Sequence, residues 1–312
     1  MKCHVVRTAV LAAAFLILST FSLSAEEGAI GQNEPAWVFY EKGLSEMYRQ
    51  DYGSALYYFQ QDLSRQRVMP ETEVAIGDVY FFQGDYPLAE RQYNKALEMK
   101  EAFTLQNFTY EISYRLARLY KNQSNWGQMY RALLSVTKDD TIFHDPRYDL
   151  FRIKTKDLYK NKGFDVMFIF NRIDESFATR AHAQLAEYYY RTWNFEVALD
   201  DALFSVIPVL TESVKEIRNS RPEYQYKTLR DFLSIGLAMD TVKRYLEEQE
   251  FWKRLYYLAL ISYEKIDIRD NGIFLLKILA DTPAAGTYRD RAASQLSRPA
   301  REQRLDAPRI EM

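Results

Sequence analysis

The sequence predicts an all-α protein built from helix-turn-helix repeats. The first observation is a self-similarity at an offset of 34 residues, the length of one helix-turn-helix repeat. The second is the composition, in which 47% of residues are hydrophobic and 15% are aromatic, enough for an extensive core. The third is that 312 residues include only 11 glycines and 9 prolines, too few for a loop-rich β protein.

The first two repeats carry small and aromatic residues at matching positions. The first copy has Gly43, Asp51, Tyr52, Ala55, Leu56, Phe59 and Leu63, and the second has Gly77, Asp85, Tyr86, Ala89, Glu90, Tyr93 and Leu97. Small side chains at Gly77 and Ala89 suit a close crossing of the two helices of one repeat. The rings of Tyr80, Tyr86 and Tyr93 would fill the space around that crossing.

These residues resemble the tetratricopeptide repeat family. The second copy carries the resemblance most fully, with Ile76-Gly77, Tyr80, Gly84-Asp85-Tyr86, Ala89, Tyr93 and Ala96-Leu97. A third copy has Leu116-Ala117, Tyr120, Asn125-Trp126 and Leu133, a degenerate fourth has Leu158, Gly163-Phe164 and Met167, and a fifth has Leu185-Ala186, Tyr189, Asn194-Phe195 and Ala198-Leu199. The resemblance implies five repeats over residues 36–206, stacked into a right-handed superhelical solenoid.

The helices after residue 206 are harder to assign to repeats. We expect Pro208 to open another amphipathic helix. Two pairings remain open for the segments that follow. Either Trp252 to Glu264 pairs with Asn271 to Leu279, or Leu237 to Tyr245 pairs with the helix that begins at Phe251. Residues 207–296 would thus form degenerate repeats and a cap, and residues 297–312 a disordered tail.

The N-terminus has the features of a cleaved secretory signal peptide over residues 1–25. Two basic residues, Lys2 and Arg7, precede an apolar run from Val10 to Leu18, and small or polar residues follow. We expect cleavage near Ser24 or Ala25, a flexible leader over residues 26–35, and a periplasmic or secreted protein. Retention of the segment as an N-terminal anchor is the alternative.

The net charge and the cysteine content argue against several further classes of protein function. Cys3 is the only cysteine and lies in the signal segment, so the mature chain would have no disulfide and no thiol nucleophile. After cleavage 39 basic residues would face 43 acidic ones, a net charge of −4. This balance does not favour a nucleic-acid partner.

Motifs for catalysis are missing from the sequence. It has no Gly-rich phosphate loop, no Gly-x-Ser-x-Gly elbow and no His-Glu-x-x-His helix. We interpret His144 as part of a solvated loop and His182 as a surface or groove residue. Adjacent acids such as Asp139-Asp140 and Asp200-Asp201 would point about 100° apart on a helix, which suits a solvated face better than a catalytic pair. We therefore expect no enzyme activity, no cofactor and no metal.

The resemblance places the first helix of each repeat along a concave groove. Its groove positions in the first two repeats are Trp37, Tyr40, Leu44, Met47, Tyr48, Glu71, Val74, Asp78, Phe81 and Phe82, an aromatic and apolar set. In the later repeats they are Tyr114, Arg118, Lys121, Asn122, Arg152, Lys156, Tyr159, Lys160, Arg180, Glu187, Tyr190 and Arg191, a largely basic set. Two structural readings compete with a binding role: the aromatic residues could be covered by other protein, and nearby acids could balance the basic ones.

We expect a scaffold that binds a protein or peptide partner with apolar and acidic residues. The predicted partner-binding residues are Tyr40, Leu44, Met47, Tyr48, Phe81, Phe82, Arg118, Lys121, Arg152, Lys156, Lys160 and Arg191. Such a scaffold could serve envelope assembly or transport. The alternatives are an all-α envelope glycan-binding protein or enzyme, and an accessory to small-molecule transport.

Overall fold

A computed structural model describes residues 34–66 and 68–298, and all the regular secondary structure in these residues is helical. This confirms the all-α prediction. The expected signal peptide, most of the expected leader and nearly all of the expected tail lie outside the described residues. Within the described ranges, no helix has both the length and the hydropathy that a bilayer span requires.

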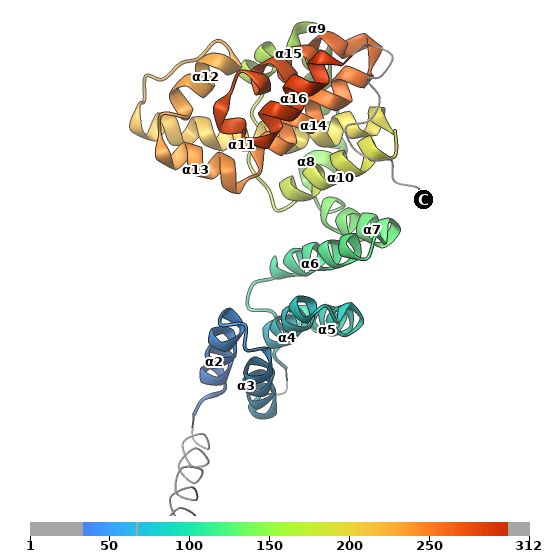
Figure 1. Cartoon of the computed structure of the whole chain (residues 1–312), viewed down its shortest axis with the longest axis vertical. Coiled ribbons are helices and arrows are strands. Elements are labelled where there is room, and N and C mark those ends of the chain that lie inside the picture. The colour runs from blue at the N-terminus through green and yellow to red at the C-terminus, as the bar shows by residue number, and fades with distance from the viewer. Residues whose placement is uncertain (1–33, 67, 299–312) are drawn as a thin grey trace, which may run out of the picture. The chain divides into compact units, whose positions relative to one another are not determined.

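The chain forms two compact units that divide after Gln106. The first unit contains the helices drawn from blue to teal in Figure 1, which are α2 (Ala36–Tyr48), α3 (Tyr52–Arg65), α4 (Pro70–Gln83), α5 (Tyr86–Glu98) and the short 3-10 helix η1 (Lys100–Ala102). Helix α2 packs against α3, and α4 packs against α5. This unit therefore consists of two helical hairpins.

The second unit begins at Asn107. Its helices are α6 (Phe108–Asn122), α7 (Trp126–Thr137), α8 (Thr141–His144), α9 (Asp149–Phe170), α10 (Thr179–Arg191), α11 (Phe195–Ser220), α12 (Leu229–Gly236), α13 (Asp240–Glu248), α14 (Phe251–Glu264), α15 (Arg269–Ala280) and α16 (Thr287–Ser297), with short 3-10 helices at Pro146–Tyr148, Ile266–Ile268 and Pro283–Ala285. The main adjacent pairs are α6 with α7, α10 with α11, and α14 with α15.

One turn recurs along both units. The residues Gln50, Gly84, Ser124 and Trp193 all have positive φ, between 57° and 82°. At each of these turns the next residue donates its N–H to a carbonyl five residues back, as in Asp85 N to Tyr80 O at 2.9 Å. This is the bond that closes a helix through a left-handed residue. The side chain of Asp51, Asp85 or Asn125 then caps the next helix.

Close helix crossings lie at the glycines that the repeat pattern identified. A Cβ atom added at Gly43 would stand 2.5 Å from the ring of Phe59, and one at Gly77 would stand 2.6 Å from the ring of Tyr93. The two contacts are 34 residues apart, as predicted. In the second unit, a Cβ atom at Gly272 would stand 2.4 Å from the backbone nitrogen of Tyr263. Helix α15 therefore packs closely on α14, which is the first of the two pairings left open by the sequence.

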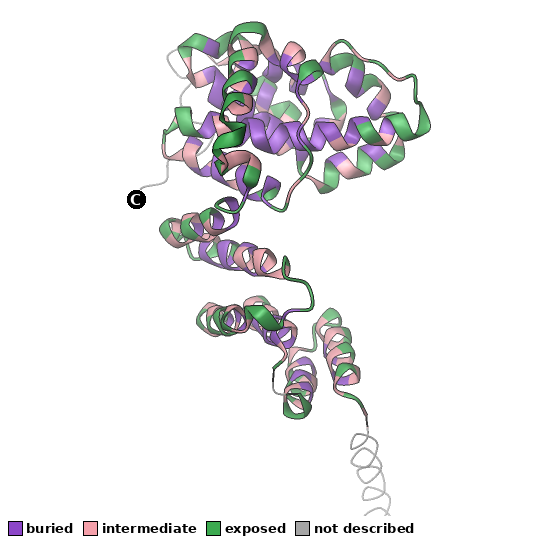
Figure 2. Cartoon of the chain, turned by 180° about the vertical axis from the view of Figure 1, so that it is seen from behind, coloured by how far each residue is buried: buried purple, intermediate pink, exposed green. Residues whose placement is uncertain are grey.

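The core of the second unit is centred on α11 and α14. Sixteen of the 26 residues of α11 are buried, and Figure 2 shows buried residues running along the middle of this unit. Pro208 lies inside α11, so the prediction that it opens a new helix is wrong. Proline removes one helical hydrogen bond, but the residues on both sides of Pro208 are buried and hold the helix continuous. The boundary expected at residue 206 thus falls within α11.

Candidate functional site

Three aromatic side chains of the first unit are exposed at predicted groove positions. The exposed fraction is 92% for Tyr48, 64% for Trp37 and 53% for Phe82. Burying an aromatic ring is favourable, so three exposed rings on one small unit are unusual enough to mark a candidate contact surface. We call Trp37, Tyr48 and Phe82 the aromatic set.

The remaining predicted residues of this unit are less accessible. Tyr40, Leu44 and Met47 are half-buried and pack against the core formed by Ala55, Phe59 and neighbouring residues. Phe81 is also half-buried. Val74, another groove position, is buried at 2% exposure, which corrects its expected place in the groove. Residues of helix α2 that face α3 therefore stabilise the hairpin. The accessible rings lie near helix termini, with Trp37 at the start of α2, Tyr48 at its end and Phe82 at the end of α4.

Neighbouring rings fix the position of Phe82. Its ring stacks on Tyr52 at a centroid distance of 6.5 Å, with an angle of 7° between the planes. It meets Phe81 edge to face at 5.7 Å, and Phe81 in turn contacts Tyr86. These residues come from the end of α4 and the first turns of α3 and α5. A ring held in this way loses little further freedom when it binds.

The predicted basic residues of α9 are engaged with acidic side chains. Lys156 Nζ lies 2.6 Å from Asp200 Oδ1, and Lys160 Nζ lies 3.3 Å from Glu196 Oε1. Arg152 forms an ion pair with Asp149 and donates to the carbonyl of Ile142 at 2.7 Å. We call these pairs the α9 ladder. On this face of α9, nearby acids therefore balance the basic residues, which is the alternative to a binding role.

Two other basic groove positions are exposed, whereas three tyrosines at groove positions are not. The exposed residues are Arg118 and Arg180, and Arg180 forms an ion pair with Glu111 at 3.2 Å. In contrast, the groove positions Tyr114, Tyr159 and Tyr190 are buried, with exposures of 7%, 0% and 3%. The Tyr159 hydroxyl lies 2.6 Å from Ser262 Oγ, which explains how its polar end is satisfied inside the unit.

Three cations surround one carboxylate at Glu187 on α10. Lys253 Nζ lies 2.9 Å from Glu187 Oε2, Lys121 Nζ lies 3.8 Å from the same oxygen, and Arg191 lies 3.7 Å from Oε1. Burial alone would raise the pKa of Glu187, but Lys253, Lys121 and Arg191 outweigh burial and hold this pKa below its ordinary value. Lys121 and Arg191 were predicted, whereas Lys253 was not. We call these four residues the Glu187 cluster.

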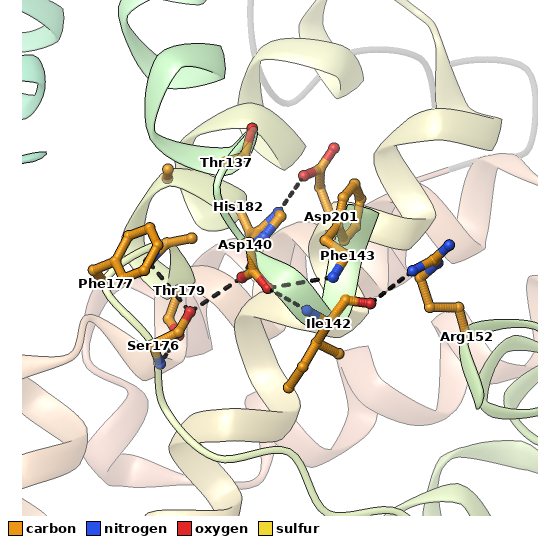
Figure 3. Close-up of polar contacts among 12 residues, drawn as sticks. Thr137, Asp140, Ile142, Phe143, Arg152, Ser176, Phe177, Thr179, His182 and Asp201 are labelled. Carbon is orange, nitrogen blue, oxygen red and sulfur yellow. Dashed lines mark hydrogen bonds and ion pairs between the residues drawn. The ribbon is translucent and has the colours of Figure 1, made fainter. Parts of the chain in front are cut away.

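His182 is buried, which corrects its expected place on the surface or in the groove. Its exposed fraction is 1%, and its Nδ1 atom lies 2.7 Å from Asp201 Oδ1 while Nε2 lies 3.3 Å from Asp140 Oδ2 (Figure 3). Burial would lower the pKa of His182, but hydrogen bonds and charge from the two aspartates outweigh it and raise the pKa to about 9. The imidazole is therefore charged at neutral pH.

The two aspartates were expected on solvated surfaces, and this too is corrected. Asp201 lies inside the packing of α10 on α11, and Asp140 accepts three hydrogen bonds besides its contact with His182 (Figure 3). Asp140 Oδ1 accepts from the N–H groups of Ile142 and Phe143, and Oδ2 accepts from Ser176 Oγ at 3.1 Å. His182 thus joins α11, the turn at α8 and the segment before α10. Both ring nitrogens are engaged, which indicates a structural role.

His144 ends the short helix α8 and is exposed, in agreement with its interpretation as part of a solvated turn. Among residues 34–66 and 68–298, no three His, Cys, Asp or Glu side chains are grouped as ligands of a metal ion.

The chain is similar to two spirochaetal proteins. It is 24% identical over 282 residues to an uncharacterized protein of Borreliella burgdorferi, covering 82% of this chain and 86% of that protein. It is 26% identical over 236 residues to an uncharacterized protein of Treponema pallidum, covering 73% of this chain. The match spans 61% of the Treponema protein, so that relative extends well beyond the shared region. No model of a known protein family matches the chain.

Proposed function

We propose that this protein is a non-catalytic scaffold of the tetratricopeptide type that binds a protein or peptide partner in the bacterial envelope. Support for the repeat type comes from the 34-residue spacing of the Gly43–Phe59 and Gly77–Tyr93 contacts and from the recurring left-handed turn. A right-handed superhelix follows from this proposal. The envelope location rests on the signal-like residues 1–25.

The observation that carries the binding proposal is the exposure of the aromatic set. Tyr48, Trp37 and Phe82 each remain more than half exposed, although the first unit has an apolar core of its own. Covering one such ring with a partner contributes on the order of 1.5 to 3 kcal/mol. Aromatic anchors of this kind carry most of the affinity in many protein interfaces. A polypeptide with apolar side chains is therefore the partner that fits this surface.

Site-specific photo-crosslinking in cells that express the protein tests this proposal. A photoreactive phenylalanine analogue replaces Tyr48 in one strain and Phe82 in another. A third strain carries it at Tyr57, an aromatic residue of α3 that is 57% exposed but lies outside the aromatic set. We expect one discrete crosslinked polypeptide from positions 48 and 82 and none from position 57. Equal labelling at all three positions, or no product from 48 and 82, would contradict the proposal.

A further inference from the structure

The Glu187 cluster differs from every other group of ion pairs described above in its charge balance. Lys121 comes from the last turn of α6, Arg191 from the last turn of α10 and Lys253 from the first turn of α14. Among the described residues, the ion pairs of Lys121 and Lys253 both go to Glu187. One carboxylate is thus shared by two lysines even before Arg191 is considered.

The α9 ladder provides the contrast. There Lys156 is matched by Asp200, and Lys160 by Glu196 and Asp267, two acids that also form ion pairs with Lys265 outside α9. Each of these lysines thus has at least one acidic partner of its own or shares two, whereas in the Glu187 cluster Lys121 and Lys253 share one carboxylate. Glu250, one turn before Lys253, adds negative charge at longer range without forming an ion pair with it. The positive surplus is therefore local to the Glu187 cluster.

The cluster also has an apolar wall and is open to solvent. The Arg191 guanidinium lies 5.1 Å from the centroid of the Trp126 ring, and Trp126, Met129 and Tyr188 line the same hollow as Lys121 and Glu187. The Lys121 side chain is 40% exposed and that of Lys253 is 24% exposed, while the Glu187 side chain is only 13% exposed. Both lysine side chains are thus more accessible to solvent than the carboxylate that they share.

We propose that the Glu187 cluster binds the carboxylate of an acidic side chain in the partner polypeptide, with Lys121 and Lys253 as the binding cations. This inference rests on the proposed function for the identity of the partner as a polypeptide. The chemistry is that of a single anionic group whose methylene carbons lie against Trp126. Among the described residues, the ladder lysines Lys156 and Lys160 are already paired with acids, so they do not extend the cluster into a row of free cations that would follow a nucleic-acid backbone.

The proposal makes an unusual prediction for Glu187 itself. Glu187 competes with an incoming carboxylate for the same two lysines, so its removal should strengthen anion binding. Loss of the lysines should weaken it. A merely structural ion pair would behave differently, because removing either side would leave anion binding unchanged or reduce it through misfolding. The sign of the Glu187→Gln effect therefore separates the two roles.

The experiment titrates the mature protein with hexaglutamate, with hexaglutamine as the uncharged probe, by isothermal calorimetry at low salt. We expect hexaglutamate alone to bind. Lys121→Gln/Lys253→Gln should weaken its binding at least about tenfold, and Glu187→Gln should tighten it several-fold. Lys156→Gln/Lys160→Gln removes the same amount of charge from the ladder and should change the affinity less than about twofold. Circular dichroism confirms that each variant is folded.

Several results would overturn the proposal. The first is equal binding of hexaglutamate by the wild type and the Lys121/Lys253 variant. The second is weaker binding of hexaglutamate by a folded Glu187→Gln variant. The third is stronger binding of tripolyphosphate than of hexaglutamate, which would assign the site to phosphate. Lys121→Gln alone, at the most exposed of the lysines, serves if the double variant does not fold. Crosslinking at Tyr48 is independent of these probes. If a partner is crosslinked but hexaglutamate does not bind, this inference alone is refuted. If hexaglutamate binds but no partner is crosslinked, the proposed function alone is refuted.

Discussion

The ring of Tyr93 lies so close to Gly77 that a Cβ atom at position 77 would stand 2.6 Å from Tyr93 Cε1. Tyr93 is fully buried, and its hydroxyl donates to Asp78 Oδ1 at 2.7 Å, so the ring has little room to move. Glycine at position 77 thus sets the distance between α4 and α5. The same relationship holds between Gly43 and Phe59 in the preceding hairpin.

Replacing Gly77 with Ala should therefore destabilise the first unit. Overpacking of a tight core costs about 1 to 3 kcal/mol, which exceeds the gain of up to about 1 kcal/mol from Gly→Ala within a helix. Gly127→Ala is the matched control, because a Cβ atom at this helical glycine would meet nothing within 4 Å. Urea unfolding should show a loss of stability for the first variant and no loss for the second. Equal stability of both would refute the close crossing.

The pattern of residues predicted this part of the fold because repeat packing is local in sequence. Gly77 and Tyr93 lie on the two helices of one hairpin, and the turn between these helices consists of Gly84 and Asp85. The residues assigned to the degenerate fourth copy lie in α9, where Gly163 has a φ of 84° and marks a kink. Local geometry of this kind leaves a signature at fixed spacing.

The residues that form long-range polar contacts show no fixed spacing in the sequence. Lys156 meets Asp200, which lies 44 residues further along the chain. Glu187 and Lys253 come from different hairpins, and no periodic pattern joins them. His182 was misassigned for the same reason, because its two aspartates approach from α11 and from the turn before α8. Sequence spacing identifies which helix face a residue shares, but not which distant helix covers it.

The buried His182 should make stability depend on pH in the alkaline range. Its folded pKa of about 9 lies above the unfolded value of roughly 6.5. The charged imidazole therefore contributes stability fully below pH 6.5, and this contribution is lost as the pH rises through 9. This difference between the folded and unfolded pKa values corresponds to a stabilisation of at most about 3 kcal/mol. We expect the unfolding free energy of the wild type to fall between pH 6.5 and 9.

His182→Gln is the comparison for this measurement. The variant should be less stable than the wild type at pH 6.5, and the difference between the two should shrink toward pH 9. Guanidinium unfolding at several pH values measures this difference directly. A difference that stays constant with pH would show that the imidazole is neutral in the fold.

The α9 ladder should stabilise the chain without contributing much to binding. In the variant Lys156→Gln/Lys160→Gln, the carboxylates of Asp200 and Glu196 lose cations that pair with them. We expect a loss of about 1 kcal/mol, smaller at high salt, because the pairs are partly exposed. Hydrogen exchange should rise in the first half of α9 and remain unchanged in the first unit. Unchanged exchange throughout α9 would show that the ladder does not anchor this helix.

The proposed envelope location predicts a shortened N-terminus. Signal cleavage near Ser24 or Ala25 would leave a mature chain that begins at Ala25 or Glu26. Edman sequencing or intact-mass measurement of protein from the native cell fraction distinguishes these ends from the full chain. Recovery of Met1 in a membrane fraction would instead support an N-terminal anchor.

The most direct test of the scaffold proposal measures the affinity of the crosslinked partner for aromatic and ladder variants side by side. Tyr48→Ala/Phe82→Ala removes two exposed rings, each worth on the order of 1.5 kcal/mol or more, so we predict at least about a 100-fold loss of affinity. Lys156→Gln/Lys160→Gln should change it less than about fivefold. Partner binding that survives the aromatic substitutions with helicity intact would contradict the account.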